Sequence, residues 1–247
     1  MITWLDGEIV EKKQWYTDLY SIKIKTRPLD FIAGQFVIIG LDKEGTRIHR
    51  PYSLVNPPTD ALLEVHFNTV KEGDFSPLLT EASVGDPIYI SHRPSGLLTL
   101  AETPDVTNLW FFATGTGIGP FLSILQTEEP WQRFEKITVC YSVKTAAEMA
   151  YRQDFEQLAQ QYPDQFCFVP FITREKTTDA IHSRVTKYLK SGKLEKHVNL
   201  PLLPDNSHVM LCGNSKMLDE ATQILEKKGL QRHTRAKPGQ ISIEKYF

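Results

Sequence analysis

The sequence contains few cysteines, carries almost no net charge and has no long apolar run. Its 247 residues include three cysteines and 28 Lys and Arg residues against 30 Asp and Glu residues, for a formal net charge of −2. A near-neutral charge argues against a general nucleic-acid binder, which would be basic. No stretch approaches the roughly 18 apolar residues that span a bilayer, and the first residues lack the cationic start and apolar run of a secretory signal. We therefore expect a cytoplasmic protein, not inserted in a membrane, that does not bind nucleic acid.

The cysteines also argue against metal chemistry. Cys140, Cys167 and Cys212 are widely spaced, and each lies in an apolar segment. Such residues are typical of a reduced core in a cytosolic protein. By themselves they cannot complete a four-cysteine iron–sulfur cluster or a tetrahedral zinc site. We expect no metal site.

The first part of the chain has the texture of an all-β domain. Short apolar segments alternate with turn signals, which predicts a small antiparallel barrel or sandwich. The expected strands are Gly7–Glu11, Leu19–Lys25, Gln35–Leu41, Leu62–Val70 and Pro87–Ser91. One helix start is expected, with Ser76 as N-cap and Pro77 at the first helical position.

After residue 103 the pattern changes to strand followed by helix. The expected strands are Asn108–Ala113, Lys136–Tyr141, Gln165–Ile172 and His208–Cys212, and the expected helices are Pro120–Gln126, Arg152–Gln161, Arg184–Ser191 and Met217–Lys228. Apolar strands that alternate with helices indicate a parallel sheet covered on both faces. The fold class is therefore all-β followed by α/β, with a domain boundary between residues 102 and 103.

Two short motifs suggest ligand chemistry. Gly115-Thr116-Gly117-Ile118-Gly119-Pro120 follows an apolar strand and opens a helix, where backbone N–H groups and the helix dipole can receive a phosphate. Arg50-Pro51-Tyr52-Ser53 offers a cation, a flat aromatic ring and a hydroxyl. These groups suit the diphosphate, the ring system and the reactive nitrogen of a flavin dinucleotide. Each motif alone also fits a plain structural role, as a tight strand-to-helix turn or an ordinary strand end.

Taken in order along the chain, the motifs resemble one family. The set consists of Arg50–Ser53, Gly73-Asp74-Phe75-Ser76-Pro77, Gly115–Pro120, Cys212-Gly213-Asn214 and the terminal Tyr246-Phe247. It resembles the ferredoxin/flavodoxin–NADP⁺ reductase family in its short bacterial form, over essentially the whole chain. The resemblance implies an FAD-binding antiparallel β-barrel at residues 1–102 and a Rossmann-like NADP(H)-binding α/β domain at residues 103–247, with residues 239–247 returning to the flavin.

The resemblance also implies a set of flavin-binding residues. They are Arg50, Pro51, Tyr52, Ser53, His66, Asn68, Asp74, Phe75, Ser76, Tyr246 and Phe247. Ser76 matches the position whose backbone and hydroxyl hold the FAD diphosphate, and a helix start favours an anion there. His66 to Asn68 match the strand along the ribityl chain. The terminal aromatic pair matches a tail that packs on the dinucleotide, although docking in any apolar groove would also explain it.

For the nicotinamide nucleotide the resemblance implies a second set: Thr116, Val143, Lys144, Thr173, Arg174, Arg184, Gly213 and Asn214. Arg174 and Arg184 match the family's arginines for the 2′-phosphate, the group that separates NADP from NAD. Lys144 stands where bacterial relatives often carry arginine. Cys212 matches the residue beside the nicotinamide. The expected catalytic residues are Ser53, Cys212 and Glu244, the last as a proton-assisting carboxylate near the flavin edge.

The implied activity is hydride exchange between NADP(H) and FAD, followed by one-electron exchange with ferredoxin or flavodoxin. The carrier would be a separate protein, since this chain has too few cysteines for a cluster. A basic run could steer an acidic carrier, or could simply be a solvated face: Lys227, Lys228, Arg232, Arg235 and Lys237. We expect a monomer. The alternatives are an oxygenase reductase component or a flavin/quinone reductase on the same scaffold, and a non-catalytic flavin-binding electron-transfer or regulatory subunit.

Overall fold

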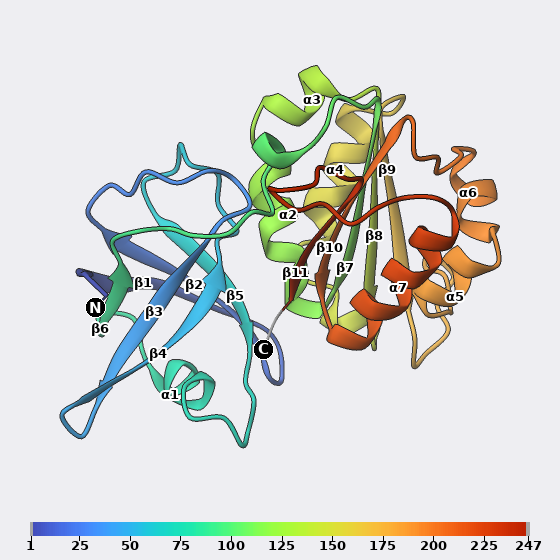
Figure 1. Ribbon diagram of the computed structural model, residues 1–247. Helices are drawn as coiled ribbons and strands as arrows, with labels where there is room; N and C mark the ends of the chain where they lie inside the picture. The colour runs from blue at the N-terminus through green and yellow to red at the C-terminus, as the bar shows by residue number, and fades with distance from the viewer. Residues whose placement is uncertain (1, 246–247) are drawn as a thin grey trace. The chain divides into compact units, whose positions relative to one another are not determined.

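The computed structural model describes residues 2–245, and its chain forms two compact units (Figure 1). The first unit extends to Thr99 and includes Gly119–Thr127, whereas the second consists of Leu100–Ile118 and the chain from Glu128 onward. Gly119–Thr127 join the first unit through side-chain hydrogen bonds. Ser123 Oγ donates to the carbonyl of Asn56 at 2.7 Å, and Gln126 Nε2 donates to the carbonyl of Val55 at 2.8 Å. The division at Thr99 lies close to the expected boundary, and the assignment of a cofactor to each domain stays a prediction at this point.

The first unit is built on a six-stranded sheet in the order β4-β3-β6-β1-β2-β5. Its strands are β1 (Trp4–Tyr16), β2 (Leu19–Thr26), β3 (Phe36–Lys43), β4 (Thr46–Ser53), β5 (Leu63–Asn68) and β6 (Pro87–Ser91). A bridge between Leu54 and Val65 joins the chain after β4 to β5. The two edge strands therefore meet and the sheet curls into a barrel. Alternate residues such as Ile22 and Ile24 point into a buried apolar core, as the two-residue period of a strand requires.

Strand β4 was not among the expected strands. Most of its residues are exposed or half-buried, so it lacks the apolar alternation by which a strand is recognised. It forms because a tight turn at Glu44 and Gly45, both with positive φ (51° and 78°), folds it back on β3 as a hairpin.

Helix α1 (Ser76–Glu81) begins one residue earlier than expected. Phe75 occupies the N-cap position and makes no side-chain cap, so the prediction of Ser76 as N-cap is wrong. Ser76 is the first helical residue, and its Oγ accepts the backbone N–H of Val70 at 2.8 Å. This contact ties the start of the helix to the loop that follows β5.

The second unit contains a five-stranded parallel sheet in the order β11-β10-β7-β8-β9. The strands are β7 (Asn108–Thr114), β8 (Lys136–Val143), β9 (Phe166–Ile172), β10 (Ser207–Gly213) and β11 (Ile241–Lys245). The chain builds outward from β7 through β8 to β9 and then returns to the other side of β7 with β10 and β11. This is a doubly wound order whose switch point lies between β7 and β10. Ligands of such sheets bind outside the carboxyl ends of the strands at that point.

Helices cover both faces of this sheet (Figure 1). They are α3 (Glu129–Arg133), α4 (Arg152–Gln161), α5 (Val185–Lys190), α6 (Lys193–Val198) and α7 (Ser215–Lys227). Helix α2 (Gly119–Leu125) belongs to the first unit. Trp110 and Phe112 of β7 lie in one apolar core with residues of α5, α6 and α7. On the opposite face, Phe155 of α4 stacks on Phe168 with ring centroids 4.8 Å apart. The predicted parallel sheet with two covered faces is confirmed. None of the helices described is long and apolar enough to cross a bilayer.

Three elements of the second unit were not expected: α3, α6 and β11. Strand β11 is short and lies at the sheet edge, where it pairs in parallel with β10. The expected return of residues 239–247 to the flavin stays a prediction, and Tyr246 and Phe247 lie outside the residues that the structure describes.

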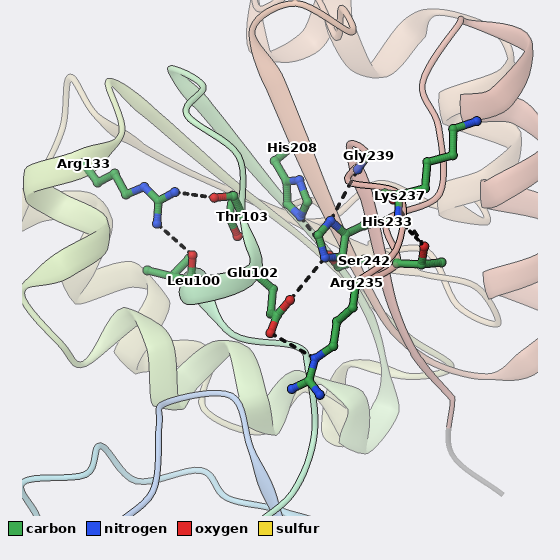
Figure 2. Close-up of polar contacts among 11 residues, drawn as sticks. Leu100, Glu102, Thr103, Arg133, His208, His233, Arg235, Lys237, Gly239 and Ser242 are labelled. Carbon is green, nitrogen blue, oxygen red and sulfur yellow. Dashed lines mark hydrogen bonds and ion pairs between the residues drawn. The ribbon is translucent and has the colours of Figure 1, made fainter.

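Polar side chains hold the segment that opens the second unit (Figure 2). Arg133 of α3 donates to the carbonyls of Leu100 and Thr103. Figure 2 shows the Glu102 carboxylate between His233 and Arg235, with His233 Nε2 3.4 Å from Glu102 Oε2 and Arg235 Nε 3.7 Å from Glu102 Oε1. The start of the unit is thereby joined to the turn that precedes β11.

Candidate functional site

In the first unit, an aromatic cluster surrounds the side chain of Tyr52 near the end of β4. The Tyr52 ring lies 5.8 Å from the Phe75 ring and 6.2 Å from the Phe67 ring, centroid to centroid. Burial raises the pKa of the Tyr52 phenol, against an opposing effect of the Arg50 charge. The phenol therefore stays protonated at neutral pH, and its ring is held by neighbours from β5 and from the residue before α1.

Ser53 lies at the end of β4 and is buried, with 6% of its surface exposed. The first residue of α2 lies beside it, because a Cβ at Gly119 would be 3.9 Å from the Ser53 carbonyl oxygen and 3.4 Å from the Val55 side chain. The glycine motif thus ends against the strand that carries Ser53.

His66 on β5 is buried and hydrogen-bonded through Nδ1. This nitrogen lies 2.9 Å from the carbonyl oxygen of Tyr20 and 3.1 Å from Ser21 Oγ. Because a carbonyl only accepts, Nδ1 carries the proton. Burial lowers the pKa of His66 to about 4, although the bond to Tyr20 opposes this effect. The imidazole is therefore neutral near pH 7.

Arg50 and Asp74 bring β4 and the loop before α1 together. Arg50 Nη2 lies 3.8 Å from Asp74 Oδ2, and the two side chains are 53% and 80% exposed. An ion pair this exposed contributes little stability, so the guanidinium remains accessible to an anion. Pro51 and Asn68 are also exposed. The predicted flavin residues within the described part of the chain thus come from β4, β5 and the start of α1.

In the second unit, two turns meet at the switch point between β7 and β10. A Cβ at Gly117 would lie 2.5 Å from the carbonyl oxygen of Cys212, and one at Gly213, which has φ +128°, would lie 2.2 Å from Thr114 Oγ1. Neither position has room for a side chain, so both glycines allow the turns to touch. Gly115, in contrast, adopts φ +52° with nothing within 4 Å of the Cβ position.

Thr114 and Asn214 fix this contact. Thr114 Oγ1 accepts the backbone N–H of Asn214 at 2.8 Å. The Asn214 side chain caps α7 by accepting the N–H of Lys216 at 3.0 Å. The N-terminus of the 13-residue helix α7 therefore starts at the carboxyl end of β10, next to the glycine turn that contains Thr116.

Cys212 and Glu244 are register partners on β10 and β11. Cys212 is fully buried and, like Cys140 and Cys167, is not part of a disulfide within residues 2–245. Glu244 is half-buried. Two of the expected catalytic residues, separated by more than thirty positions in the sequence, are thus adjacent in the sheet.

The carboxyl ends of β8 and β9 carry the remaining predicted residues. The N–H of Thr173 donates to the carbonyl of Val143 at 3.1 Å, and the N–H of Arg174 donates to the carbonyl of Lys144 at 2.8 Å. Arg184 is the N-cap residue of α5. Both arginines are exposed, and within residues 2–245 neither guanidinium forms an ion pair.

These two halves match known protein families. Residues 8–98 match the family model of the oxidoreductase FAD-binding domain, and residues 111–223 match that of the oxidoreductase NAD-binding domain. A flavodoxin/ferredoxin–NADP reductase of Buchnera aphidicola subsp. Baizongia pistaciae is 37% identical over 249 residues, covering 100% of both chains. The chain belongs to the flavodoxin/ferredoxin–NADP reductase family. The reductase of Shigella flexneri is 34% identical, with 100% of both chains covered.

A solved structure of this family has the same fold. A ferredoxin NADP⁺ reductase from Neisseria gonorrhoeae, with bound FAD and NADP, superimposes with a TM-score of 0.94 at 30% identity and covers 99% of both chains. The predicted family, fold class, enzyme class and pair of cofactors are confirmed. The roles of single residues stay predictions.

The structure of this chain also shows one site residue that the sequence did not predict, and it changes the description of the basic run. Thr114 was not predicted, although a threonine that ends a strand just before a glycine turn is a usable signal for a turn-bonding hydroxyl. The basic run near the C-terminus is not one uniform patch, because Lys228 pairs with Glu195 at 2.6 Å and Arg235 pairs with Glu102. Lys227, Arg232 and Lys237 are exposed.

Proposed function

We propose that the chain transfers electrons between NADP(H) and a separate ferredoxin or flavodoxin through bound FAD. The observation that carries this proposal lies at the carboxyl ends of the strands in the second unit. There the glycine-containing turns after β7 and β10 meet at the switch point, and two exposed arginines follow β9. The family relatives named for the same reaction support it. We further propose that the protein acts as a monomer. We also propose that it acts in the cytoplasm, in keeping with three cysteines that form no disulfide within the described residues.

The chain's own groups fit the two cofactors. The first unit offers a cation at Arg50, buried hydroxyls at Ser53 and Ser76, and a ring at Tyr52 held by neighbouring aromatics. FAD, when bound, can exchange two electrons as a hydride and release them singly. Ser53 would donate a hydrogen bond to the ring system, Tyr52 would stack on it, and Arg50 would bind the diphosphate through charge-assisted hydrogen bonds.

The second unit would bind and orient the nicotinamide nucleotide. The turn containing Thr116 and the N-terminus of α7 supply backbone N–H groups for phosphates. Arg174 and Arg184 would bind the 2′-phosphate. Cys212 is proposed to lie beside the nicotinamide, where its buried side chain would set the shape of the site. Its half-buried register partner Glu244 would hold a proton near the flavin edge.

The cofactor assignment is tested by the double variant Arg174→Ala/Arg184→Ala. A charge-assisted hydrogen bond contributes about 1.5–3 kcal/mol, which corresponds to roughly ten- to a hundredfold in affinity. We expect the KM for NADPH to rise by at least tenfold while that for NADH stays constant, measured by steady-state reduction of an artificial acceptor. Lys190→Ala, which removes a cation from α5, is the matched control. Equal losses with NADPH and NADH would reject the assignment.

The carrier is tested by reduction of purified ferredoxin and flavodoxin. We expect NADPH-dependent reduction of at least one of them, faster than with NADH. If NADPH reduces only artificial acceptors and neither protein, the proposed partner is wrong and the flavin/quinone reductase alternative is favoured.

A further inference from the structure

The two arginines proposed for the 2′-phosphate lie at opposite ends of one irregular segment. Residues 173–184 connect β9 to α5 without helix or strand of their own. Arg174 is held at the start by its backbone bond to Lys144, and the end is held by Ile181, whose N–H donates to the Pro170 carbonyl at 2.9 Å. The middle of the segment is exposed at Glu175 and Asp179. The spacing between the arginines therefore depends on what holds this middle part.

Two side-chain contacts tie it to the neighbouring chain, one to the connection between β8 and α4 and one to the first residue of α4. The Glu175 carboxylate accepts the backbone N–H of Ala146. Asp179 Oδ2 lies 2.7 Å from Arg152 Nη2. Arg152 is the first residue of α4, and its Nε donates to Glu156 Oε1, one turn along the same helix, at 2.7 Å. The guanidinium is thus held by its own helix through Nε and reaches the segment through Nη2.

Helix α4, which carries Arg152, is packed against the sheet. Phe155 is fully buried and stacks on Phe168 of β9 at 4.8 Å. Arg152 is therefore attached to the same strand that leads into the segment. The Arg152–Asp179 pair closes a loop from β9 through the segment to α4 and back to β9.

We propose that the Arg152–Asp179 ion pair positions the segment that carries Arg174 and Arg184, and thereby contributes to selection of the 2′-phosphorylated nucleotide. This inference rests on the proposed function. The pair is partly exposed, with side chains 26% and 53% accessible, so it adds little to global stability. Its effect lies in ordering the segment before the ligand arrives, which lowers the entropy lost on binding. The affinity should increase most for a nucleotide whose 2′-phosphate contacts both arginines, and least for one that lacks this phosphate.

The charges of the pair make the proposal separable from a long-range electrostatic effect. Arg152→Gln removes a positive charge and Asp179→Asn removes a negative one. If the pair only modified the local field, NADP⁺, which carries the additional phosphate, would bind more weakly to the first variant and more tightly to the second. If the pair positions the segment, both variants bind NADP⁺ more weakly. The double variant is then no weaker than either single one, because the contact is already lost.

The test is calorimetric titration of the FAD-loaded protein with NADP⁺ and, separately, with NAD⁺. An exposed pair of this kind is worth up to about fivefold in an equilibrium constant. We expect a two- to fivefold increase in the Kd for NADP⁺ in both variants and no change for NAD⁺, with an unchanged urea unfolding midpoint. Asp154→Asn, which removes an exposed carboxylate from the same helix, is the matched control and should leave both Kd values unchanged. Arg152→Lys keeps the positive charge opposite Asp179, so it should weaken NADP⁺ less than Arg152→Gln does.

Opposite shifts in the two variants, or no shift in either, would overturn the inference. Its failure is distinguishable from failure of the proposed function. If Arg174→Ala/Arg184→Ala selectively weakens NADPH but the pair variants do not, only the positioning role is wrong. If that double variant treats NADPH and NADH alike, the assignment of the arginines is wrong as well.

Discussion

Replacing Gly213 with alanine should destabilise the protein by more than the backbone strain of an alanine at positive φ, because the new Cβ would also clash with Thr114. Gly213 has φ +128° and lies where β10 turns toward α7. A Cβ there would lie 2.2 Å from Thr114 Oγ1 and 2.7 Å from the Thr114 carbonyl oxygen. These atoms belong to the strand end that meets Gly213, so the clash is with backbone as well as with a side chain.

The cost has two parts. A non-glycine residue in a sparsely populated backbone region costs on the order of 1–3 kcal/mol. Thr114 must also move, which breaks its 2.8 Å bond from the N–H of Asn214, and a hydrogen bond of this kind contributes about 0.5–1.5 kcal/mol. The sum is about 1.5–4.5 kcal/mol. For a chain of this size, about 2–4 °C per kcal/mol converts the sum to a fall in Tm of roughly 3–18 °C.

Gly192 provides the matched control. It has φ +70° with nothing within 4 Å of the Cβ position, so Gly192→Ala pays only the left-handed penalty of about 1 kcal/mol. Thermal unfolding by far-ultraviolet circular dichroism of the FAD-loaded variants measures both. The affinity of Gly213→Ala for NADP⁺ should fall as well, because the turn at the switch point is displaced. If Gly213→Ala loses no more stability than Gly192→Ala, the two turns do not touch as described.

The remaining predictions concern pH and hydride transfer. Burial, aided by the charges of His233 and Arg133, lowers the pKa of His208 from 6.5 to about 3, so the unfolded chain binds an additional proton as pH falls below about 6.5. The free energy of unfolding should therefore fall with decreasing pH by about 1.4 kcal/mol per pH unit for this histidine. Urea unfolding between pH 7 and pH 5 measures this dependence, and His208→Gln should make it less steep. His92→Gln, which removes an exposed imidazole, should leave it unchanged. Ser53→Ala should slow flavin reduction by NADPH roughly tenfold, the equivalent of one hydrogen bond, with FAD retained. An unchanged rate in stopped-flow absorbance would remove Ser53 from the catalytic residues.

Signals contained in short segments of the chain were enough to predict much of this protein. Apolar strands interrupted by turns predicted the barrel, and strands alternating with helices predicted the parallel sheet. A strand buried on one face alternates apolar and polar residues, whereas a strand buried on both faces is apolar throughout, so a short segment shows which kind it is. The motif containing Tyr52 and Ser53 and the turn after Thr114 identified the family by residue type and spacing. These features require only a few consecutive residues to be recognised.

Contacts between distant segments decided the features that the sequence did not predict. β4 has little apolar alternation and is a strand because β3 lies beside it, and β11 is a strand because β10 does. The Ser76 hydroxyl bonds to Val70 rather than capping its helix, since the fold brings that loop within reach.

The same limit applies at the candidate site. The register of Cys212 with Glu244 and the pairing of Arg152 with Asp179 depend on strand order and helix packing. The sequence spacing of these residues contains no trace of either contact. Hydrogen bonds and ion pairs act over a few ångströms in space whatever the separation along the chain, so local composition predicted the elements and their chemistry, while the packed fold set which side chains meet.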